Sequence, residues 1–263
     1  MKIIVLLKQV PGTSDIGIDP ERGTLKREGV PAKTNPYDLH ALEAALEIRD
    51  RLRSFATVTV VSMGPAQAEA VIRESYWMGA DDGVLMTDRA FAGADTLATA
   101  FTLSQVVKQI GFDLIIAGMQ STDGDTAQVG PGVAEFLGIP HVSYVRSVSD
   151  IGAGSLTVVA DLGERLLTQE VALPCLITVT RDLNQPRLPS FRKRKETASR
   201  AVALVDAGSL PAEGERHYGL AGSPTRVEKV FPPKSERVQE TWEGPPAELA
   251  ARLGALLKRV LSP

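Results

Sequence analysis

The chain has 263 residues, 43% of them hydrophobic, a size that suits one large domain or a domain with an extension. Its formal net charge of -3 argues against a generic nucleic-acid-binding protein, and no apolar run approaches the roughly 20 residues of a membrane span. The single cysteine, Cys175, excludes an intrachain disulfide, and its apolar neighbours predict an unreactive buried thiol in a cytoplasmic protein.

Strands and helices alternate from residue 1 to about residue 140. Apolar or β-branched runs predict buried strands at residues 3–7, 57–63, 84–87 and 113–117. Helical periodicity and caps predict helices at residues 35–52, 66–78, 95–110 and 129–137, and a Pro/Gly turn predicts a hairpin at residues 16–25. This order is typical of a doubly wound, mostly parallel α/β sheet, Rossmann-like or adenine-nucleotide α-hydrolase-like. Ligands of such sheets lie beyond the carboxyl ends of the strands.

The residues Asn35-Pro36-Tyr37-Asp38 stand directly before the first long helical pattern. Asn35 suits the N-cap, Pro36 the first helical position and Asp38 the first turn. Helix initiation alone explains these residues. A helix start at the carboxyl end of a strand also commonly lines a ligand site, so both interpretations stay open.

The stretch Ser121–Gly132 joins the strand ending near Gly118 to the helix that begins at Val129. Backbone N–H groups at such a helix start favour an anion, so the strand–loop–helix order indicates a phosphate site. Side chains that could bind phosphate or ribose oxygens are Ser121, Asp123, Asp125, Thr126 and Gln128. The loop matches neither a Walker A motif nor GxGxxG, and a plain polar connection is the alternative.

The second half of the chain predicts further strands and then a change of character. Strands are expected at residues 141–148, 156–160, 166–171 and 176–180, extending the sheet partly in antiparallel fashion. Two prolines within residues 184–191 predict a loop, and the basic run Arg192–Lys195 is either a solvated face or a surface for an acidic partner. From about residue 205 the composition predicts an extended arm. A terminal helix at residues 245–261 carries the apolar stripe Leu249, Leu253, Leu256, Leu257, Val260 and Leu261.

Six short motifs, in this order and spacing, resemble the β subunit of electron transfer flavoproteins. They are Val5–Pro11, Asn35–Asp38, Ser62–Ala66, Met78–Asp81, Gln120–Pro131 and Leu183–Arg187. The likeness covers residue 3 to about residue 199. We therefore expect a nucleotide-binding α/β domain at residues 1–200, with a partner-recognition loop at residues 183–199, and an arm with a terminal helix at residues 201–263.

The resemblance implies a heterodimer with an α subunit, which holds most of one FAD near the interface. It implies that the β subunit binds a structural AMP, or a second FAD in its place. Tyr37 would face the flavin, and Thr13 falls near an aromatic position of some relatives. The cofactor-binding residues implied are Leu6, Asn35, Pro36, Tyr37, Asp38, Met63, Asp123, Gly124, Asp125, Thr126, Ala127, Gln128, Val129, Gly130, Pro131 and Ala134. The partner-binding residues implied are Pro186, Arg187 and Phe191, with Phe191 at the place of an anchoring leucine.

The resemblance thus implies an electron carrier and not an enzyme in the strict sense. It would take electrons from flavin dehydrogenases, such as acyl-CoA dehydrogenases, and pass them to a membrane quinone reductase. A second hypothesis is a subunit of a flavin-based bifurcating complex that uses NADH. A third is a nucleotide-binding α/β module without a redox role. None of the three involves nucleic acid, a metal site or a membrane span in this chain.

Overall fold

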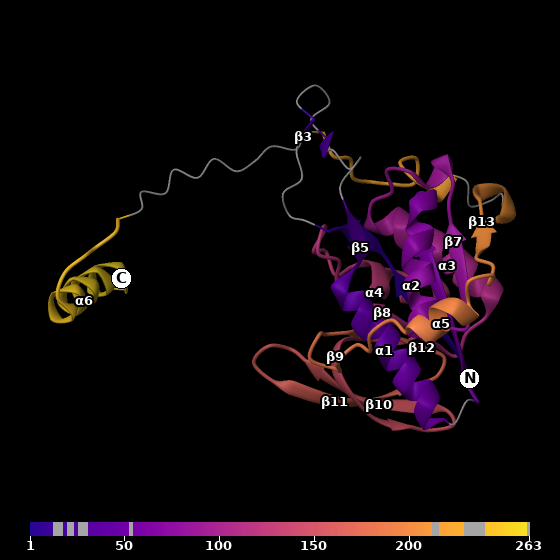
Figure 1. Cartoon of the computed structure of the whole chain (residues 1–263), viewed down its shortest axis with the longest axis horizontal. Coiled ribbons are helices and arrows are strands. Elements are labelled where there is room, and N and C mark those ends of the chain that lie inside the picture. The colour runs from indigo at the N-terminus through magenta and orange to yellow at the C-terminus, as the bar shows by residue number, and fades with distance from the viewer. Residues whose placement is uncertain are drawn as a thin grey trace. The chain divides into compact units, whose positions relative to one another are not determined.

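The computed structural model describes residues 1–12, 18–19, 24–25, 31–52, 55–211, 216–228 and 240–261 (Figure 1). The chain divides into two compact units, residues 1–229 and residues 230–263. The first unit contains the sheet and most of the helices. The second contains the amphipathic helix α6 (Pro246–Leu261), which confirms the terminal helix expected from the sequence.

A nine-stranded sheet forms the centre of the first unit within the described residues. Its order is β11 (Leu166–Ala172), β10 (Ser155–Asp161), β9 (His141–Ile151), β12 (Cys175–Val179), β8 (Leu114–Gly118), β1 (Lys2–Leu7), β6 (Thr57–Met63), β7 (Asp82–Met86) and β13 (Ala203–Val205). The pairs β9–β10 and β10–β11 are antiparallel, and the other neighbouring pairs are parallel. The doubly wound, mostly parallel α/β fold predicted from the sequence is therefore confirmed.

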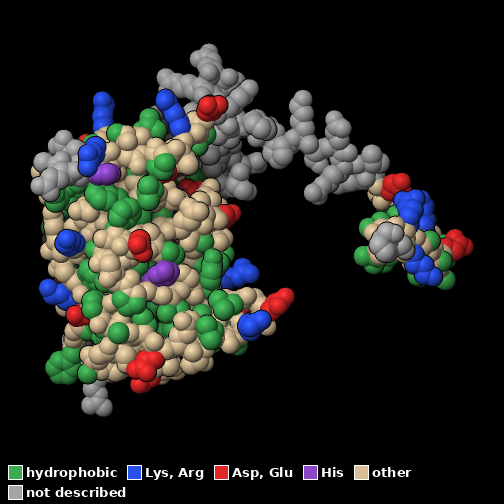
Figure 2. Space-filling model, turned by 180° about the vertical axis from the view of Figure 1, so that it is seen from behind, with side chains coloured by type: hydrophobic (Ala, Val, Ile, Leu, Met, Phe, Trp, Pro, Cys, Tyr) green, Lys and Arg blue, Asp and Glu red, His purple; other side chains and the backbone are tan. Residues whose placement is uncertain are grey.

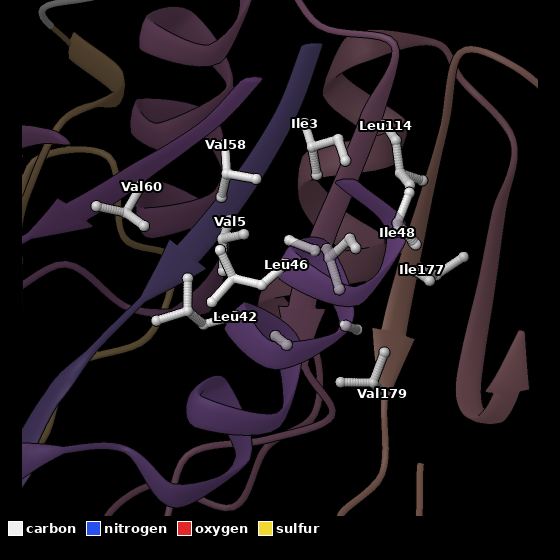
Figure 3. Close-up of a cluster of buried hydrophobic side chains, with 14 of the residues drawn as sticks. Ile3, Val5, Leu42, Leu46, Ile48, Val58, Val60, Leu114, Ile177 and Val179 are labelled. Atoms are coloured by element: carbon white, nitrogen blue, oxygen red, sulfur yellow. The ribbon is translucent and has the colours of Figure 1, made fainter. Parts of the chain in front are cut away.

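Helices cover both faces of the parallel strands. On one face, α1 (Pro36–Arg51) and α2 (Glu69–Met78) pack on alternate strand residues, and on the other, α3 (Thr96–Ile110) and α4 (Val129–Leu137) pack on the intervening ones. Alternate side chains of a strand point to opposite faces, which is why these strands read as continuous apolar runs. Figure 3 shows the first face, where Leu42, Leu46 and Ile48 of α1 lie against Val5, Val58 and Ile177 of the strands.

Short elements complete the fold. β2 (Gln9–Pro11) pairs with β5 (Ala32–Thr34), and β3 (Ile18–Asp19) pairs with β4 (Thr24–Leu25), which gives the strands of the predicted hairpin. The 3₁₀ turns η1 (Ala66–Ala68), η2 (Arg89–Phe91) and η3 (Ala207–Ser209) precede α2, follow β7 and follow β13, respectively. The turns of the predicted hairpin and Thr13 lie outside the described residues.

The prediction of an extended arm from about residue 205 is wrong for residues 216–228, which include residues packed on the core. Before this segment, β13 adds a parallel strand to the edge of the sheet beside β7. Further on, the buried Tyr218 packs edge-on against Phe91, and Asp95 accepts hydrogen bonds from Thr225. The composition of this segment is polar, but single apolar residues bring it onto the core.

The basic run Arg192–Lys195 also differs from the loop expected at that place. It lies in the short helix α5 (Phe191–Glu196), which begins after Ser190. Ser190 caps the helix by accepting a hydrogen bond from the Lys193 N–H, and Arg192 pairs with Glu196 one turn on. Phe191 is therefore the first residue of a helix, and only residues before it form the proline-containing loop.

Candidate functional site

The candidate site lies where the winding of the sheet reverses, between β1 and β8. From β1 the chain steps through α1 to β6 and through α2 to β7, and then α3 returns it to β8 on the other side of β1. The helices that follow these two strands, α1 and α4, cover opposite faces. Ligands of open α/β sheets bind beyond the carboxyl ends of strands at such a switch point.

Six polar residues from the segments after β1 and β8 meet there, and we call them the switch-point cluster. They are Lys8, Asn35, Asp38, Gln120, Ser121 and Asp123. Each of them donates or accepts at least one side-chain hydrogen bond within the cluster or to its backbone. Four of the six were indicated by the sequence as site residues or phosphate ligands, namely Asn35, Asp38, Ser121 and Asp123. The sequence did not indicate Lys8 or Gln120 as individual site residues.

Asp38 is the buried centre of this cluster. Its Oδ2 accepts a hydrogen bond of 2.7 Å from the Lys8 backbone N–H, and its Oδ1 accepts one of 2.9 Å from Asn35 Nδ2. Burial raises the pKa of Asp38 to about 7, although the bonds from Asn35 and Lys8 act in the opposite direction. The carboxyl group therefore ties the end of β1 to the first turn of α1, and it changes charge near neutral pH.

Asn35 joins the start of α1 to the loop after β8. Its Nδ2 also donates to the Gln120 carbonyl at 2.9 Å, and its Oδ1 accepts from the Thr122 N–H at 3.3 Å. The residue occupies the N-cap position, as predicted, but its side chain makes no capping hydrogen bond to α1. The side-chain amide instead forms hydrogen bonds with the loop after β8. This use of an N-cap residue departs from ordinary helix initiation, and it occurs at a candidate binding site.

Lys8 brings a positive charge to the phosphate-type loop. Its Nζ lies 2.7 Å from Asp123 Oδ1 and 3.2 Å from Ser121 Oγ. Burial by itself raises the pKa of Asp123, but the bonds from Lys8 and Ser121 outweigh it, so the pKa of Asp123 is lowered overall. The ammonium is about half exposed, so the pair contributes little to stability, and Lys8 can turn toward an anionic ligand.

The backbone between Asp125 and α4 presents free hydrogen-bond donors. Asp125 and Ala127 have positive φ values of 50° and 55°, and Gln128 returns to the right-handed region. Within the described part of the chain, the backbone N–H groups of residues 126–129 donate to no protein acceptor. Alternation of left- and right-handed residues turns successive N–H groups to one side, and a helix start adds a favourable dipole for an anion.

Two glycines allow the backbone to pack closely around this site. A Cβ at Gly118, the last residue of β8, would collide with Asp38 Oδ1 and would lie 2.7 Å from Tyr37 Cβ. A Cβ at Gly130, in the first turn of α4, would lie 2.5 Å from Thr178 Cγ2 on β12. These close approaches bring α1 and α4 to the ends of the neighbouring strands. Gly118 is not among the site residues that the sequence indicated.

The remaining cofactor-binding residues expected from the resemblance lie on β1, β6, α1, α4 and the loop after β8. Leu6 is buried near the end of β1, and Met63 ends β6. Pro36 and Tyr37 are half-buried at the start of α1, and Gly124 lies in the turn that Ser121 closes. Val129, Pro131 and Ala134 lie on α4. Their contact with a nucleotide is untested and stays a prediction.

The expected partner-binding residues lie on a separate surface, after β12. We call residues 184–196 the recognition segment. Its large exposed apolar residues are Phe191 and Leu188, with 70% and 87% of their surface accessible. The sequence indicated Phe191 but not Leu188 as a partner-binding residue. The side chain of Arg187 turns inward, toward Glu43 and Asp50 of α1, and Pro186 beside it is half-buried.

Other kinds of site receive no support within the residues that the structure describes. No helix there is long and apolar enough to cross a membrane. No group of three or more His, Cys, Asp or Glu side chains in that part could hold a metal ion. Cys175 is buried in the sheet, and burial raises the pKa of its thiol to about 11, which fits the predicted unreactive residue. Figure 2 shows the face opposite to that of Figure 1, where hydrophobic and charged side chains are interspersed.

Fold and cluster together define a doubly wound α/β protein with a polar, anion-suited switch point. A family model described as the electron transfer flavoprotein domain matches residues 22–210. The chain belongs to the electron transfer flavoprotein family, and its relatives identify it with the β subunits of that family. Such proteins are electron carriers rather than enzymes.

The relatives match the chain over nearly its whole length. The electron transfer flavoprotein subunit beta of Thermoanaerobacterium thermosaccharolyticum is 46% identical over 250 residues, which cover 93% of each chain. That of Megasphaera elsdenii is 43% identical over 240 residues, or 89% of this chain and 88% of the relative. The caffeyl-CoA reductase-Etf complex subunit CarD of Acetobacterium woodii is 40% identical over 260 residues, which cover 98% of each chain.

Proposed function

We propose that the chain is the β subunit of a heterodimeric electron transfer flavoprotein and holds a structural AMP at the switch-point cluster. The observation that carries the site is the row of N–H groups at residues 126–129, which have no protein acceptor among the described residues and lie at the start of α4. The same loop carries Ser121 and Asp123, which contact the Lys8 ammonium. In the heterodimer one FAD, held mainly by the α subunit near the interface, supplies the redox chemistry when bound. Tyr37 faces that flavin.

The residues of the cluster have distinct tasks in this proposal. The N–H groups of residues 126–129 donate to the phosphate oxygens, and Lys8 offsets their charge. Asn35 and Asp38 hold the end of β1, the start of α1 and the loop after β8 in one arrangement. Leu6 and Met63, at the ends of β1 and β6, supply apolar contact for the adenine.

The proposed partners follow from the exposed recognition segment. Phe191 is exposed at the start of a helix whose next four residues are basic. Exposed apolar side chains beside a cluster of one charge suit a partner with an apolar pocket and an acidic rim. We assign this surface to flavin dehydrogenases such as acyl-CoA dehydrogenases, with electrons passing on to a membrane quinone reductase.

One comparison favours a second candidate function. The relative from Acetobacterium woodii, similar over 98% of each chain, is named as a subunit of a reductase complex. By analogy, this chain would belong to a flavin-based bifurcating complex that uses NADH, with a second FAD in place of AMP. The same row of N–H groups would then receive the diphosphate of that FAD.

Co-expression with the α subunit, followed by absorption spectra and chromatography of released nucleotides, tests these assignments. One FAD and one AMP per heterodimer is the expected result. Two FAD and no AMP would replace the first assignment with the bifurcating one. A stable heterodimer without flavin would contradict both and leave a nucleotide-binding module without a redox role.

A further inference from the structure

The recognition segment has no hydrophobic core of its own. None of the residues of α5 is buried, and residues 184–190 are all exposed or half-buried. A hollow of about 450 Å³ lies beside the helix, and its lining includes Arg49 of α1, Tyr76 of α2 and Lys193 of α5. Apolar burial therefore fixes this segment only weakly, and polar contacts must determine its position.

Four polar attachments hold the segment to α1 and α2. Asn184 exchanges hydrogen bonds with His40, and the Ser190 N–H donates to the Trp77 carbonyl at 2.9 Å. The guanidinium of Arg194 stacks on the ring of Trp77 at 4.8 Å. The fourth attachment, Arg187 to Glu43, is the only one of these that reaches a buried carboxylate.

The Arg187–Glu43 attachment has the strongest geometry of the four. Arg187 Nε and Nη2 each lie 2.9 Å from a carboxylate oxygen of Glu43, and the Arg187 backbone N–H donates to Glu43 Oε2 at 3.0 Å. Nη2 also reaches Asp50 at 3.0 Å. The hydrogen bond to Glu43 raises the pKa of Arg187 most. Burial lowers it and the hydrogen bond to Asp50 raises it, so the pKa is raised overall. Both side chain and backbone are thus fixed one residue before the exposed Leu188.

Glu43 cannot itself touch a partner, because only 4% of its surface is accessible. We infer that Glu43 and Arg187 are positioning residues for partner recognition: they clamp the recognition segment to α1 so that Leu188 and Phe191 are held ready for docking. A pre-ordered segment loses less conformational entropy on binding, and the gain appears as affinity. This inference rests on the proposed function, since it assigns the device to dehydrogenase recognition.

Glu43→Gln is the informative substitution. It removes the buried charge and leaves Arg187, which is one-third exposed, to be hydrated. Arg187→Ala would instead leave a buried carboxylate without its partner, a change that itself destabilises folds. Arg187→Lys, which keeps the charge and the backbone bond but loses the bidentate geometry, serves as the second variant. Asp113→Asn is the matched control, because Asp113 also accepts from a backbone N–H, that of Lys2, but at the amino end of β1.

The first measurement is hydrogen exchange in the purified heterodimer, which needs no partner. In Glu43→Gln we expect the backbone amides of Leu188 and of residues 190–196 to exchange about tenfold faster, with the core strands and the AMP or FAD content unchanged. Arg187→Lys should show a smaller change in the same amides, and Asp113→Asn none. Unchanged exchange of these amides in both clamp variants would overturn the inference.

The second measurement is a double-mutant cycle for binding to immobilised acyl-CoA dehydrogenase. Glu43→Gln should weaken binding about tenfold when Phe191 is present, raising the KM of electron transfer without lowering kcat. In a Phe191→Ala background it should weaken binding less than threefold, because the residue that it positions is gone. Equal losses in both backgrounds would mean that Glu43 does not act through Phe191 and would also overturn the inference. Failure of the wild-type heterodimer to bind the dehydrogenase would instead contradict the proposed function, and the exchange experiment would still decide whether the clamp orders the segment.

Discussion

Replacing Gly130 by alanine should force the first turn of α4 away from β12. A Cβ at this position would lie 2.5 Å from Thr178 Cγ2, whereas ordinary contacts begin near 3.4 Å. Thr178 cannot turn aside without losing the hydrogen bond of 3.1 Å that its Oγ1 accepts from the Tyr144 N–H. Both residues are buried, so the strain is not relieved into solvent. Overpacking of this kind costs about 2–3 kcal/mol of unfolding free energy.

A second substitution tests the cause of that loss. Thr178→Ser removes the colliding methyl group and keeps the hydroxyl, and alone it should cost about 1 kcal/mol. Combined with Gly130→Ala, it should restore most of the stability. The measurement is urea unfolding of the wild type, the two single variants and the double variant. Absence of a loss in Gly130→Ala, or absence of rescue in the double variant, would refute the packing argument.

The same position tests the placement of the nucleotide. The larger Gly130→Val substitution displaces the N–H groups of residues 126–129, so the co-expressed heterodimer should lose its AMP or second FAD. Nucleotide content is measured by chromatography after denaturation, with Thr178→Ser alone as the control. Stoichiometric nucleotide in Gly130→Val would show that the phosphate lies elsewhere.

Three further predictions concern pH, the terminal unit and the exposed apolar residue. Burial raises the pKa of Asp38 from 3.8 to about 7, so its contribution to stability is complete below about pH 4 and is lost as the pH rises through 7. The free energy of unfolding should fall by up to about 4 kcal/mol over that range, and Asp38→Asn should remove this slope. Deleting residues 230–263 should weaken the heterodimer in sedimentation experiments and leave the unfolding midpoint of residues 1–229 unchanged, because the two are separate units. Equal affinity for the α subunit would contradict a role for α6 there. Phe191→Ala should weaken dehydrogenase binding by about 2 kcal/mol and leave the nucleotide content unchanged. Wild-type electron-transfer rates in this variant at limiting protein concentration would disprove the role of Phe191 as an anchor. Neutralising residues 192–195 should instead slow association with the dehydrogenase and flatten its salt dependence.

Local signals made most of the parallel sheet predictable. Asp95 caps α3 with hydrogen bonds to the Leu97 and Ala98 N–H groups, and Gly138 ends α4 in the left-handed conformation, as their residue types indicate. β13 escaped prediction because its three residues are too few to show a periodicity. Tyr218 escaped because a single buried aromatic within a polar segment has no pattern around it.

The candidate site was predictable in its location and less so in its contacts. The loop from residue 121 to 132 follows from the order of strand, loop and helix, which is local information. The role of Lys8 depends on β8 lying beside β1, and the order of strands in a sheet cannot be predicted from any single segment of the sequence. The same holds for Glu43, which on the sequence is one more charged residue of an amphipathic helix and in the fold is the buried partner of Arg187.

The bond between Lys8 and Asp123 joins residues 115 positions apart in the chain. β1, α1, β6, α2 and β7 are joined in space by short steps along the chain, whereas β8 takes its place only after the return through α3. Closure of so long a loop is slow compared with local helix and strand formation, so the cluster should be among the last parts of the unit to assemble. A nucleotide bound as proposed would need both halves of the cluster. It would therefore bind only chains in which β8 lies beside β1, and it would add its binding energy to those chains alone. The ligand would thereby stabilise subunits in which β8 lies in the sheet, and these subunits would be the ones that assemble with a partner.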